Sequence, residues 1–240
     1  MRIAACALLT FAACHPGSDD SFPIVPQGDD TTIMPGPDAA PADASGDSLV
    51  ALTGRVCVVA DLRNLTSGCA TVGAADISVQ LGTSSTFTAD DGTFALTLPG
   101  GASPGTVWTA SAQGYVTSIV KFGGPNLIPM TTEAIYDDLL LSNGMVQGGG
   151  QGAIIGRVVT AGAARPNITA TTVPPAAYVT HYDGATPLGW EQDATGVTGV
   201  FWVPGAPAGN VTVTLAPGTA PGIVVPVGDQ SITFATFDVP

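Results

Sequence analysis

Two short motifs each occur twice in this chain: Gly54-Arg55-Val56 recurs as Gly156-Arg157-Val158, and Gly92-Thr93-Phe94 recurs as Gly199-Val200-Phe201. The copies lie about 100 residues apart, which is close to the usual length of one domain. A nearly constant offset between similar motifs is typical of a repeated structural unit. The sequence therefore predicts two copies of one domain in tandem.

Segments of alternating apolar and polar residues accompany the first copy of these motifs. Such alternation places every second side chain on the same face of a strand. The turn signals Asp91-Gly92 and Gln113-Gly114 punctuate the apolar runs at short spacing. The apolar side chains that share a face are Ile77, Val79 and Leu81 in one segment and Phe94, Leu96 and Leu98 in the other. This pattern predicts an all-β chain of the sandwich type.

The composition also favours β-structure with many turns. Charged residues make up 10% of the chain, whereas there are 31 Gly and 20 Pro. The formal net charge is −13, and Lys and Arg together number six. Because nucleic-acid binding requires a patch of basic side chains to neutralise phosphates, this composition argues against a nucleic-acid partner.

The amino terminus has the parts of a bacterial export signal. Arg2 precedes a mostly apolar run over residues 3–13, which is shorter than the roughly 20 residues needed to cross a bilayer. The junction Phe11-Ala12-Ala13-Cys14 resembles the lipobox of bacterial lipoproteins, in which the cysteine carries diacylglycerol. We therefore expect a signal peptide over residues 1–13, lipidation of Cys14 and export of the protein. An ordinary signal peptide with an unmodified cysteine is the alternative.

The segment after Cys14 predicts a tether. Residues 14–48 are rich in Pro and Asp, contain no Lys or Arg and have Phe22 as their only aromatic residue. Such a segment cannot bury enough apolar surface to offset the entropy of ordering, so we expect it to be disordered. By analogy with enteric bacteria, His15 after the lipidated cysteine favours the outer membrane.

The remaining chain is expected to hold two domains and a connector. We assign β-sandwich domains to residues 49–130 and 153–240, and a short helical connector with a glycine linker to residues 131–152. The connector begins with Thr132 as a helix cap, has Ile135 and Leu139 spaced by four, and has Gly144 as a stop signal. The glycines of residues 148–152 favour a flexible joint.

The motifs resemble those of the carboxypeptidase regulatory-like family, whose domain is a transthyretin-like, or more broadly Ig-like, β-sandwich. In the first copy the resemblance also includes residues 73–77, residues 88–94 and Gln113-Gly114-Tyr115. The first copy departs from the family pattern by an insertion between Val58 and Val72, and the second by an excursion around residues 178–193. Because members of this family are non-catalytic modules, the resemblance implies a structural or protein–protein interaction role.

The sequence offers little for catalysis. Gly101-Ala102-Ser103-Pro104-Gly105 matches the nucleophile elbow of serine hydrolases, but that elbow uses the backbone N–H of the residue after the serine. Pro104 has no such N–H. His181 is the only histidine outside the expected tether, and we interpret it as a surface-loop residue. No zinc-binding spacing is present, so we expect no metal site. Together with the Ser103 and His181 observations, this leads us to expect no enzyme activity and no cofactor.

Aromatic residues of the second copy leave two functions open. The first is docking on another envelope protein. The second is carbohydrate binding or adhesion, because alternation places Trp202 on the opposite face of its strand from Phe201 and Val203 and can expose its ring. The candidate stacking residues are Tyr178, Tyr182, Trp190 and Trp202. The alternative is that these rings only pack beneath a loop.

We predict a disulfide bond between Cys57 and Cys69. Cys6 leaves with the signal peptide and Cys14 carries lipid, so two thiols remain in an exported and oxidising compartment. Closing a loop of about 13 residues should stabilise the domain by about 3 kcal/mol. Thiol labelling of natively exported protein should leave both cysteines unmodified until a reductant is added. Labelling of both residues without a reductant would contradict the bond.

Overall fold

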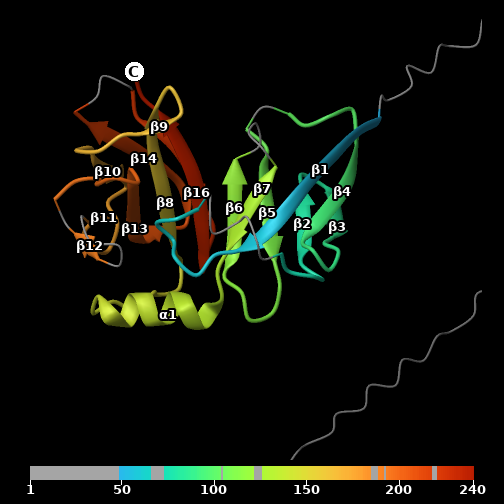
Figure 1. The fold of residues 1–240 in the computed structure, drawn as a ribbon, viewed down its shortest axis with the longest axis horizontal. Helices are drawn as coiled ribbons and strands as arrows, with labels where there is room; N and C mark the ends of the chain where they lie inside the picture. The colour runs from blue at the N-terminus through green and yellow to red at the C-terminus, as the bar shows by residue number, and fades with distance from the viewer. Residues whose placement is uncertain are drawn as a thin grey trace, which may run out of the picture. The chain divides into compact units, whose positions relative to one another are not determined.

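The computed structural model describes residues 49–65, 73–103, 105–121, 126–184, 189–191, 193–217 and 221–240 (Figure 1). By its contacts the chain divides into two units, residues 1–45 and 46–240, and every described residue lies in the second. The expected signal peptide, Cys14, the tether and Cys69 lie outside the described residues, so those expectations stay predictions. No helix in the described part is long and apolar enough to span a membrane.

The first copy of the motifs forms a β-sandwich. Its first sheet has the order β4-β1-β7, in which β1 is antiparallel to β4 and parallel to β7. Its second layer has the order β3-β2-β5-β6, with every neighbour antiparallel. The strands are β1 (Leu49–Val58), β2 (Ser78–Leu81), β3 (Ser84–Phe87), β4 (Thr93–Pro99), β5 (Val107–Ser111), β6 (Thr117–Lys121) and β7 (Leu127–Met130).

The core of this sandwich is built by the predicted alternation. In β4 the exposed and buried positions alternate along the whole strand, and Phe94, Leu96 and Leu98 are the buried ones. Ile77, Val79 and Leu81 are also buried, and Trp108 of β5 packs edge-on against Phe94 with ring centroids 5.2 Å apart. The all-β sandwich expected from the sequence is therefore confirmed for this copy.

The second copy repeats the strand order of the first. Its central strand β8 is antiparallel to β13 and parallel to β16, and a facing sheet has the order β10-β14-β15. A short arm, β11 and β12, extends the sheet beyond β13, and β9 pairs with the end of β8. The strands are β8 (Gln151–Thr160), β9 (Ala163–Ala164), β10 (Thr169–Val173), β11 (His181–Asp183), β12 (Trp190–Glu191), β13 (Val200–Pro207), β14 (Gly209–Ala216), β15 (Ile223–Val227) and β16 (Ser231–Asp238).

The repeated motifs occupy equivalent positions in the two copies. Gly54 lies opposite Phe94 in the pairing of β1 with β4, and Gly156 lies opposite Phe201 in the pairing of β8 with β13. A Cβ atom built at Gly54 would lie 2.3 Å from Phe94 Cζ, and one built at Gly156 would lie 2.1 Å from Phe201 Cζ. In both copies, therefore, the absence of a side chain on the central strand makes room for the phenylalanine ring of its antiparallel neighbour.

A backbone hydrogen bond next to each glycine also recurs. Val56 N–H donates to Gly92 O at 2.8 Å, and Val158 N–H donates to Gly199 O at 2.7 Å. Each bond joins the last residue of a Gly-Arg-Val motif to the first residue of a Gly-x-Phe motif. The two motifs of each copy thus form one structural unit, which fixes the register of the central strand pair.

The two copies share one sheet. The edge strand β6 of the first copy pairs in parallel with β16 of the second, with Ser231 opposite Thr117 and Phe234 opposite Val120. The resulting strand order is β12-β11-β13-β8-β16-β6-β5-β2-β3, and Figure 1 shows β6 and β16 side by side in the middle of the unit. Backbone hydrogen bonds therefore join the two sandwiches directly.

The glycine segment before β8 is also held in place. Gly150 N–H donates to Asp229 Oδ1 at 2.8 Å, and Gln230 Nε2 donates to Gly148 O at 2.7 Å. Asp229 and Gln230 lie in the turn between β15 and β16. The expected flexible joint is thus tied to the strand that links the two copies.

The predicted connector helix is present as α1 (Glu133–Ser142). Thr132 Oγ1 accepts a hydrogen bond from Ile135 N–H at 3.3 Å, and Gly144 adopts a positive φ of 70° after the helix ends. The cap and the stop signal are therefore confirmed. The side chains that the helix buries are Tyr136 and Leu140, each one position after the pair expected from spacing. They pack against the same face of the sheet as Trp202.

We predict that Gly156→Ala destabilises the unit by about 2 kcal/mol, because the added methyl group would overlap the Phe201 ring inside a packed core. Denaturant unfolding of the variant and the unchanged chain would measure the difference in free energy of unfolding. Gly149→Ala is the matched control, since a Cβ there would meet nothing within 4 Å. Equal free energies for the two variants would contradict the proposed contact.

Candidate functional site

The strongest concentration of aromatic and polar side chains surrounds Trp202 in β13. Its ring centroid lies 5.5 Å from that of Trp190, 5.4 Å from that of His181 and 6.3 Å from that of Tyr136. The neighbours come from β12, β11 and α1, so three elements meet over one indole ring. Trp202 is 0% exposed.

The exposed aromatic platform expected from the sequence is not formed. Trp202 lies on the opposite face of β13 from Phe201 and Val203, as alternation requires, but both faces of this strand are covered. The facing sheet β10-β14-β15 covers one side, and α1 with the segment after β1 covers the other. The interpretation of Trp202 as a solvent-facing ring is therefore wrong, and the alternative that its ring only packs is confirmed for this residue, because a second layer covers the other face of β13.

The other three candidate stacking residues are divided between separate environments. Tyr182 is buried in the opposite core, where its hydroxyl accepts from Ala170 N–H at 2.9 Å. Tyr178 is half-buried and donates its hydroxyl to Val146 O at 2.7 Å. Trp190 is half-buried beside Trp202. Tyr178 and Trp190 both pack against the core cluster that contains Trp202, whereas Tyr182 belongs to the other core. The rings of Trp190 and Trp202 are tilted by 57° rather than coplanar.

A segment of the first copy packs against this cluster. Residues 59–65, the start of the insertion noted in the sequence, leave β1 and pack Val59 and Leu62 into the core that contains Trp202. Arg63 is 7% exposed, donates to Gly189 O at 3.1 Å and places its guanidinium carbon 6.0 Å from the Trp190 ring. We call residues 59–65 the clamp segment. Sequence reasoning did not single out Arg63, because nothing local indicates its distant partner.

Arg63 is itself held by an ion pair within the clamp segment. Its Nε and Nη2 donate to the carboxylate of Asp61 at 2.8 and 2.9 Å. Burial alone would raise the pKa of Asp61, but the hydrogen bonds and positive charge of Arg63 outweigh burial and lower that pKa from its ordinary value. The pair therefore fixes the guanidinium in the orientation that reaches the second copy.

Asp183 organises the turn that leads into β13. Its side chain is 2% exposed and accepts from Gly196 N–H at 2.8 Å, from Val200 N–H at 2.9 Å and from both the N–H and the hydroxyl of Thr198 at 2.6 and 2.7 Å. A carboxylate that accepts four hydrogen bonds is saturated. Asp183 is thus a structural residue of the arm rather than a free acid.

His181 is buried, not exposed as the sequence suggested. It is 5% exposed, and its Nδ1 has no partner in the described part of the chain. Burial lowers the pKa of His181 from its ordinary value. The expectation of a surface loop is wrong because His181 belongs to β11, which pairs with the buried strand β13.

The sequence match to a hydrolase elbow falls in an ordinary turn. Ser103 is exposed in the connection between β4 and β5, and its carbonyl oxygen accepts from the N–H and the hydroxyl of Thr106. A nucleophile elbow joins a strand to a helix, whereas this turn joins two strands. The local structure around Ser103 is thus that of a turn and not that of an elbow.

Cys57 lies in the core of the unit. Its side chain is 0% exposed, and its Sγ lies 3.7 Å from Ile128 O. The backbone of Cys57 forms an isolated antiparallel β-bridge with Gly73. Cys69 lies outside the described residues, so the disulfide bond stays a prediction. Among the described residues, no group of three or more His, Cys, Asp or Glu side chains is placed to hold a metal ion.

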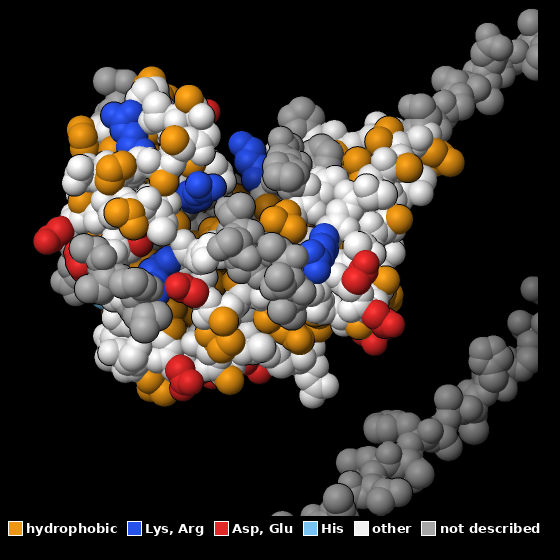
Figure 2. All heavy atoms as spheres, viewed as in Figure 1, with side chains coloured by type: hydrophobic (Ala, Val, Ile, Leu, Met, Phe, Trp, Pro, Cys, Tyr) orange, Lys and Arg blue, Asp and Glu red, His pale blue; other side chains and the backbone are white. Residues whose placement is uncertain are grey.

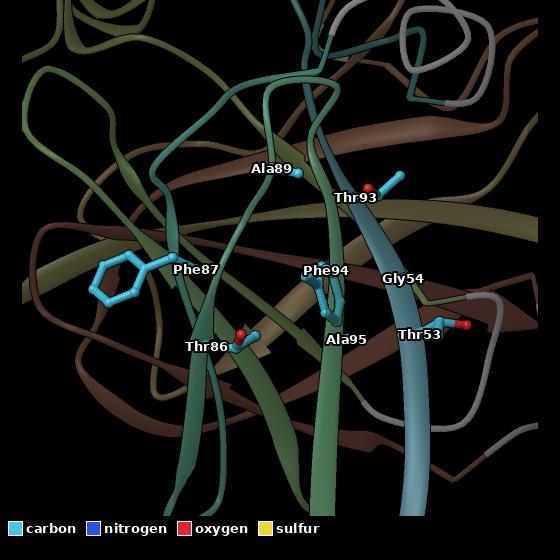
Figure 3. Close-up of a pocket in the computed structure, with 8 residues that line it drawn as sticks. All are labelled: Thr53, Gly54, Thr86, Phe87, Ala89, Thr93, Phe94 and Ala95. Carbon is cyan, nitrogen blue, oxygen red and sulfur yellow. The ribbon is translucent and has the colours of Figure 1, made fainter.

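A shallow pocket opens at the edge of the first sandwich, between β3 and β4, with a volume of about 630 Å³. Figure 3 shows Phe94 lying between the strands and the Phe87 ring directed away from it. The lining residues, which carry no ionisable side chain, are Thr53, Gly54, Thr86, Phe87, Ala89, Thr93, Phe94 and Ala95. This lining can make apolar contacts and hydroxyl hydrogen bonds but offers no acid or base.

The charged side chains on the face shown in Figure 2 are scattered. Acidic residues outnumber Lys and Arg by 19 to six in the chain. On the face shown in Figure 2, the Lys and Arg side chains form separate groups among polar and apolar atoms. That face therefore offers no continuous basic surface for a polyanion.

No protein-family model matches the sequence, and no curated protein matches it either. Among solved structures, the TIE protein of Bacillus anthracis is similar with a TM-score of 0.26 and 12% identity, over 80% of this chain and 34% of that one. A streptococcal ancillary pilin has a TM-score of 0.25 and 10% identity, over 79% of this chain and 62% of that one. GBS52, a minor pilin of Streptococcus agalactiae, has a TM-score of 0.25 and 8% identity, over 78% of this chain and 95% of that one.

These similarities are weak in both sequence and superposition, and this chain spans about a third of the first protein and less than two thirds of the second. They assign no activity and no partner to this chain. The carboxypeptidase regulatory-like family suggested by the motifs is not confirmed by any of them.

We predict that Asp183→Asn destabilises the unit by about 3 kcal/mol. An amide group would turn a donor toward the four donors that the carboxylate now satisfies, leaving buried N–H groups unpaired. Thermal and denaturant unfolding would measure the loss. Asp193→Asn is the matched control, since Asp193 is exposed and lies in the same turn region. An equal and small effect of both changes would show that Asp183 does not organise the turn.

Proposed function

We propose that this chain is a non-catalytic, lipid-anchored envelope protein whose two joined sandwiches form one rigid interaction module. The observation that carries the proposal is the sheet shared by the two copies through β6 and β16. Tandem domains on a flexible joint sample many orientations, whereas a shared sheet fixes one. A fixed orientation suits a protein whose task is to present two surfaces together to a partner, because less conformational freedom is lost on binding.

Three separate contacts support rigidity. The first is the pairing of Thr117 to Val120 with Ser231 to Phe234. The second is the clamp segment, in which Arg63 reaches from the first copy to Gly189 of the second. The third is the attachment of the glycine segment to the turn before β16. The first two contacts join the copies directly and the third fixes the connector to the second copy, so bending the unit would strain all three.

The use of the polar side chains supports a non-catalytic role. Asp183 and Arg63 have their hydrogen-bonding capacity taken up by the fold, and His181 lies under an aromatic cluster away from solvent. The pocket between β3 and β4 has no ionisable lining residue. General acid–base catalysis requires titratable groups that a substrate can reach, and these sites do not supply them.

The equivalent Gly–Phe contacts support the resemblance to carboxypeptidase regulatory-like domains. Both copies use the Gly-Arg-Val strand as the centre of a three-stranded sheet, flanked by the Gly-x-Phe strand and by a parallel last strand. We propose that the chain is a tandem of such domains, with another envelope protein as its partner.

The amino-terminal sequence supports display away from a membrane. Lipid on Cys14, followed by the Pro-rich and acidic residues 15–48, would place the module at the end of a tether. At about 3.1 Å per residue for an extended proline-rich chain, this tether reaches on the order of 100 Å. The proposed location is the bacterial envelope, at the outer membrane.

We predict that Cys14→Ser moves the protein from the membrane fraction to the soluble exported fraction, because a thioether-linked lipid is the anchor that the sequence offers. Immunoblotting of separated membrane and soluble fractions would check this. Cys6→Ser serves as the control, since Cys6 lies inside the expected signal peptide and should leave fractionation unchanged.

Retention of Cys14→Ser in membranes would contradict the anchor.

In membranes that hold a protein with Cys14 intact, a photo-crosslinker at the exposed position 224 of β15 should yield a discrete adduct with one envelope protein. Crosslinking to no protein would contradict the interaction role, and hydrolytic turnover lost on Ser103→Ala or His181→Phe would contradict the non-catalytic part.

A further inference from the structure

His181 is the titratable residue among the described side chains that have an unpaired buried polar atom. It is 5% exposed in β11, its ring lies 5.4 Å from Trp202 at an angle of 42°, and its Nδ1 has no hydrogen-bond partner in the described part of the chain. Buried polar atoms are nearly always paired. Protonation of an unpaired imidazole nitrogen in a core would therefore add a buried charge and a buried N–H donor, and both would disturb the packing around it.

His181 lies in the second copy and is linked to the first copy through its aromatic neighbours. Its strand pairs with β13 on one side and with β12 on the other, and β12 carries Trp190. Trp190 in turn lies under Arg63 of the clamp segment, which comes from the first copy. Arg63 and the rings of Trp190, Trp202 and His181 thus form one continuous row of contacts. A change at His181 acts directly on the arm β11–β12 and on the clamp segment that rests on it.

In the described part of the chain, none of the charged groups around this row forms an ion pair with His181, whose pKa is lowered by burial. Asp183, on the same strand, has its carboxylate occupied by the turn before β13. Arg63 brings a positive charge, paired with Asp61 of its own segment. The helix α1 contributes Tyr136, whose pKa is raised by burial so that it stays neutral, and Asp137, whose negative charge acts on Tyr136. The strand β12 contributes Glu191, which lies opposite Tyr182 rather than His181.

We propose that His181 makes the contact between the clamp segment and the arm β11–β12 an acid-sensitive latch, closed when the imidazole is neutral and loosened when it is protonated. In the neutral imidazole with its proton on Nε2, Nδ1 is a buried acceptor without charge. Protonation makes both ring nitrogens donors and adds a positive charge near the Arg63 row. Nδ1–H would then have no acceptor inside the core, and water would supply one only if the arm moved away.

The direction of the pH effect follows from linkage. Burial lowers the pKa of His181 in the closed state, while an opened arm returns it toward the ordinary value near 6.5. The open state therefore binds more protons, so stability of the latch is fully present above about pH 6.5 and is lost as pH falls below it. Acid opens the latch, and neutral pH closes it.

Hydrogen exchange of the full chain tests the proposal. Between pH 7.5 and pH 5.0, after correction for the intrinsic pH dependence of exchange, amides of residues 181–183 and 190–191 should lose protection progressively, because the open state binds the proton more tightly than the closed state. Amides of β5 in the first sandwich should keep theirs. Unchanged protection of the arm across this range would overturn the proposal.

Two variants identify the responsible group. His181→Phe keeps an aromatic ring but cannot be protonated, so its arm should show no loss of protection at pH 5.0. His15→Gln removes the other histidine of the chain and should behave like the unchanged protein. Both variants keep Asp61, Asp183 and Glu191, so an acid response that survives in His181→Phe would assign the effect to a carboxylate and overturn the proposal.

Direct titration decides the matter even if His181→Phe does not fold. In His15→Gln, the imidazole proton resonance of His181 is the only histidine signal, and it can be followed by NMR from pH 7.5 to 5.0. We expect the His181 signal to titrate with a pKa below the ordinary value of 6.5, or to exchange with the signal of the open state as pH falls. A sharp folded-state signal that titrates at or above 6.5 would overturn the proposal. This inference does not depend on lipid anchoring or on any partner.

Discussion

The close contact between a glycine on each central strand and a phenylalanine ring on its antiparallel neighbour is the constraint on which the fold depends. Gly54 receives Phe94 in the first copy, and Gly156 receives Phe201 in the second. Any side chain on either glycine would push the ring out of the core. Because the ring fits in one register only, the contact fixes the central strand pair, and the remaining strands of each copy assemble around it in the same order.

The second level of organisation comes from joining the copies at β6 and β16. Pairing two edge strands removes two rows of unpaired backbone groups, which are otherwise sites of unwanted association. It also places α1 and the clamp segment against the back of β8, β13 and β16, so that these strands are buried on both faces. Trp202 therefore serves as the centre of a core rather than as a surface for a ligand.

The seam between the copies contains the polar groups that a simple sandwich would avoid. Arg63, paired with Asp61, reaches across the seam to Gly189. In the arm of the second copy beside it, Asp183 is held by four hydrogen bonds and His181 Nδ1 has no partner in the described part of the chain. Buried polar groups are costly when unpaired, and their pairing specifies one arrangement among many. The seam and the neighbouring arm thus combine a fixed geometry with the acid sensitivity proposed for His181, which apolar packing alone cannot provide.

The sequence by itself determined the features that depend on near neighbours. Alternation at Phe94, Leu96 and Leu98 predicts a strand with one buried face, and Thr132 and Gly144 mark the ends of α1, because side-chain direction and capping are local properties. Only the tertiary structure decided which outer faces are covered. Period-two alternation is the same whether the second face meets water or another layer, so it could not predict the burial of Trp202. Nor could it predict that Arg63 would reach Gly189, or that β16 would pair with β6, since those contacts join residues more than 100 positions apart. Their partners are set by the packing of the whole unit, which no local pattern encodes.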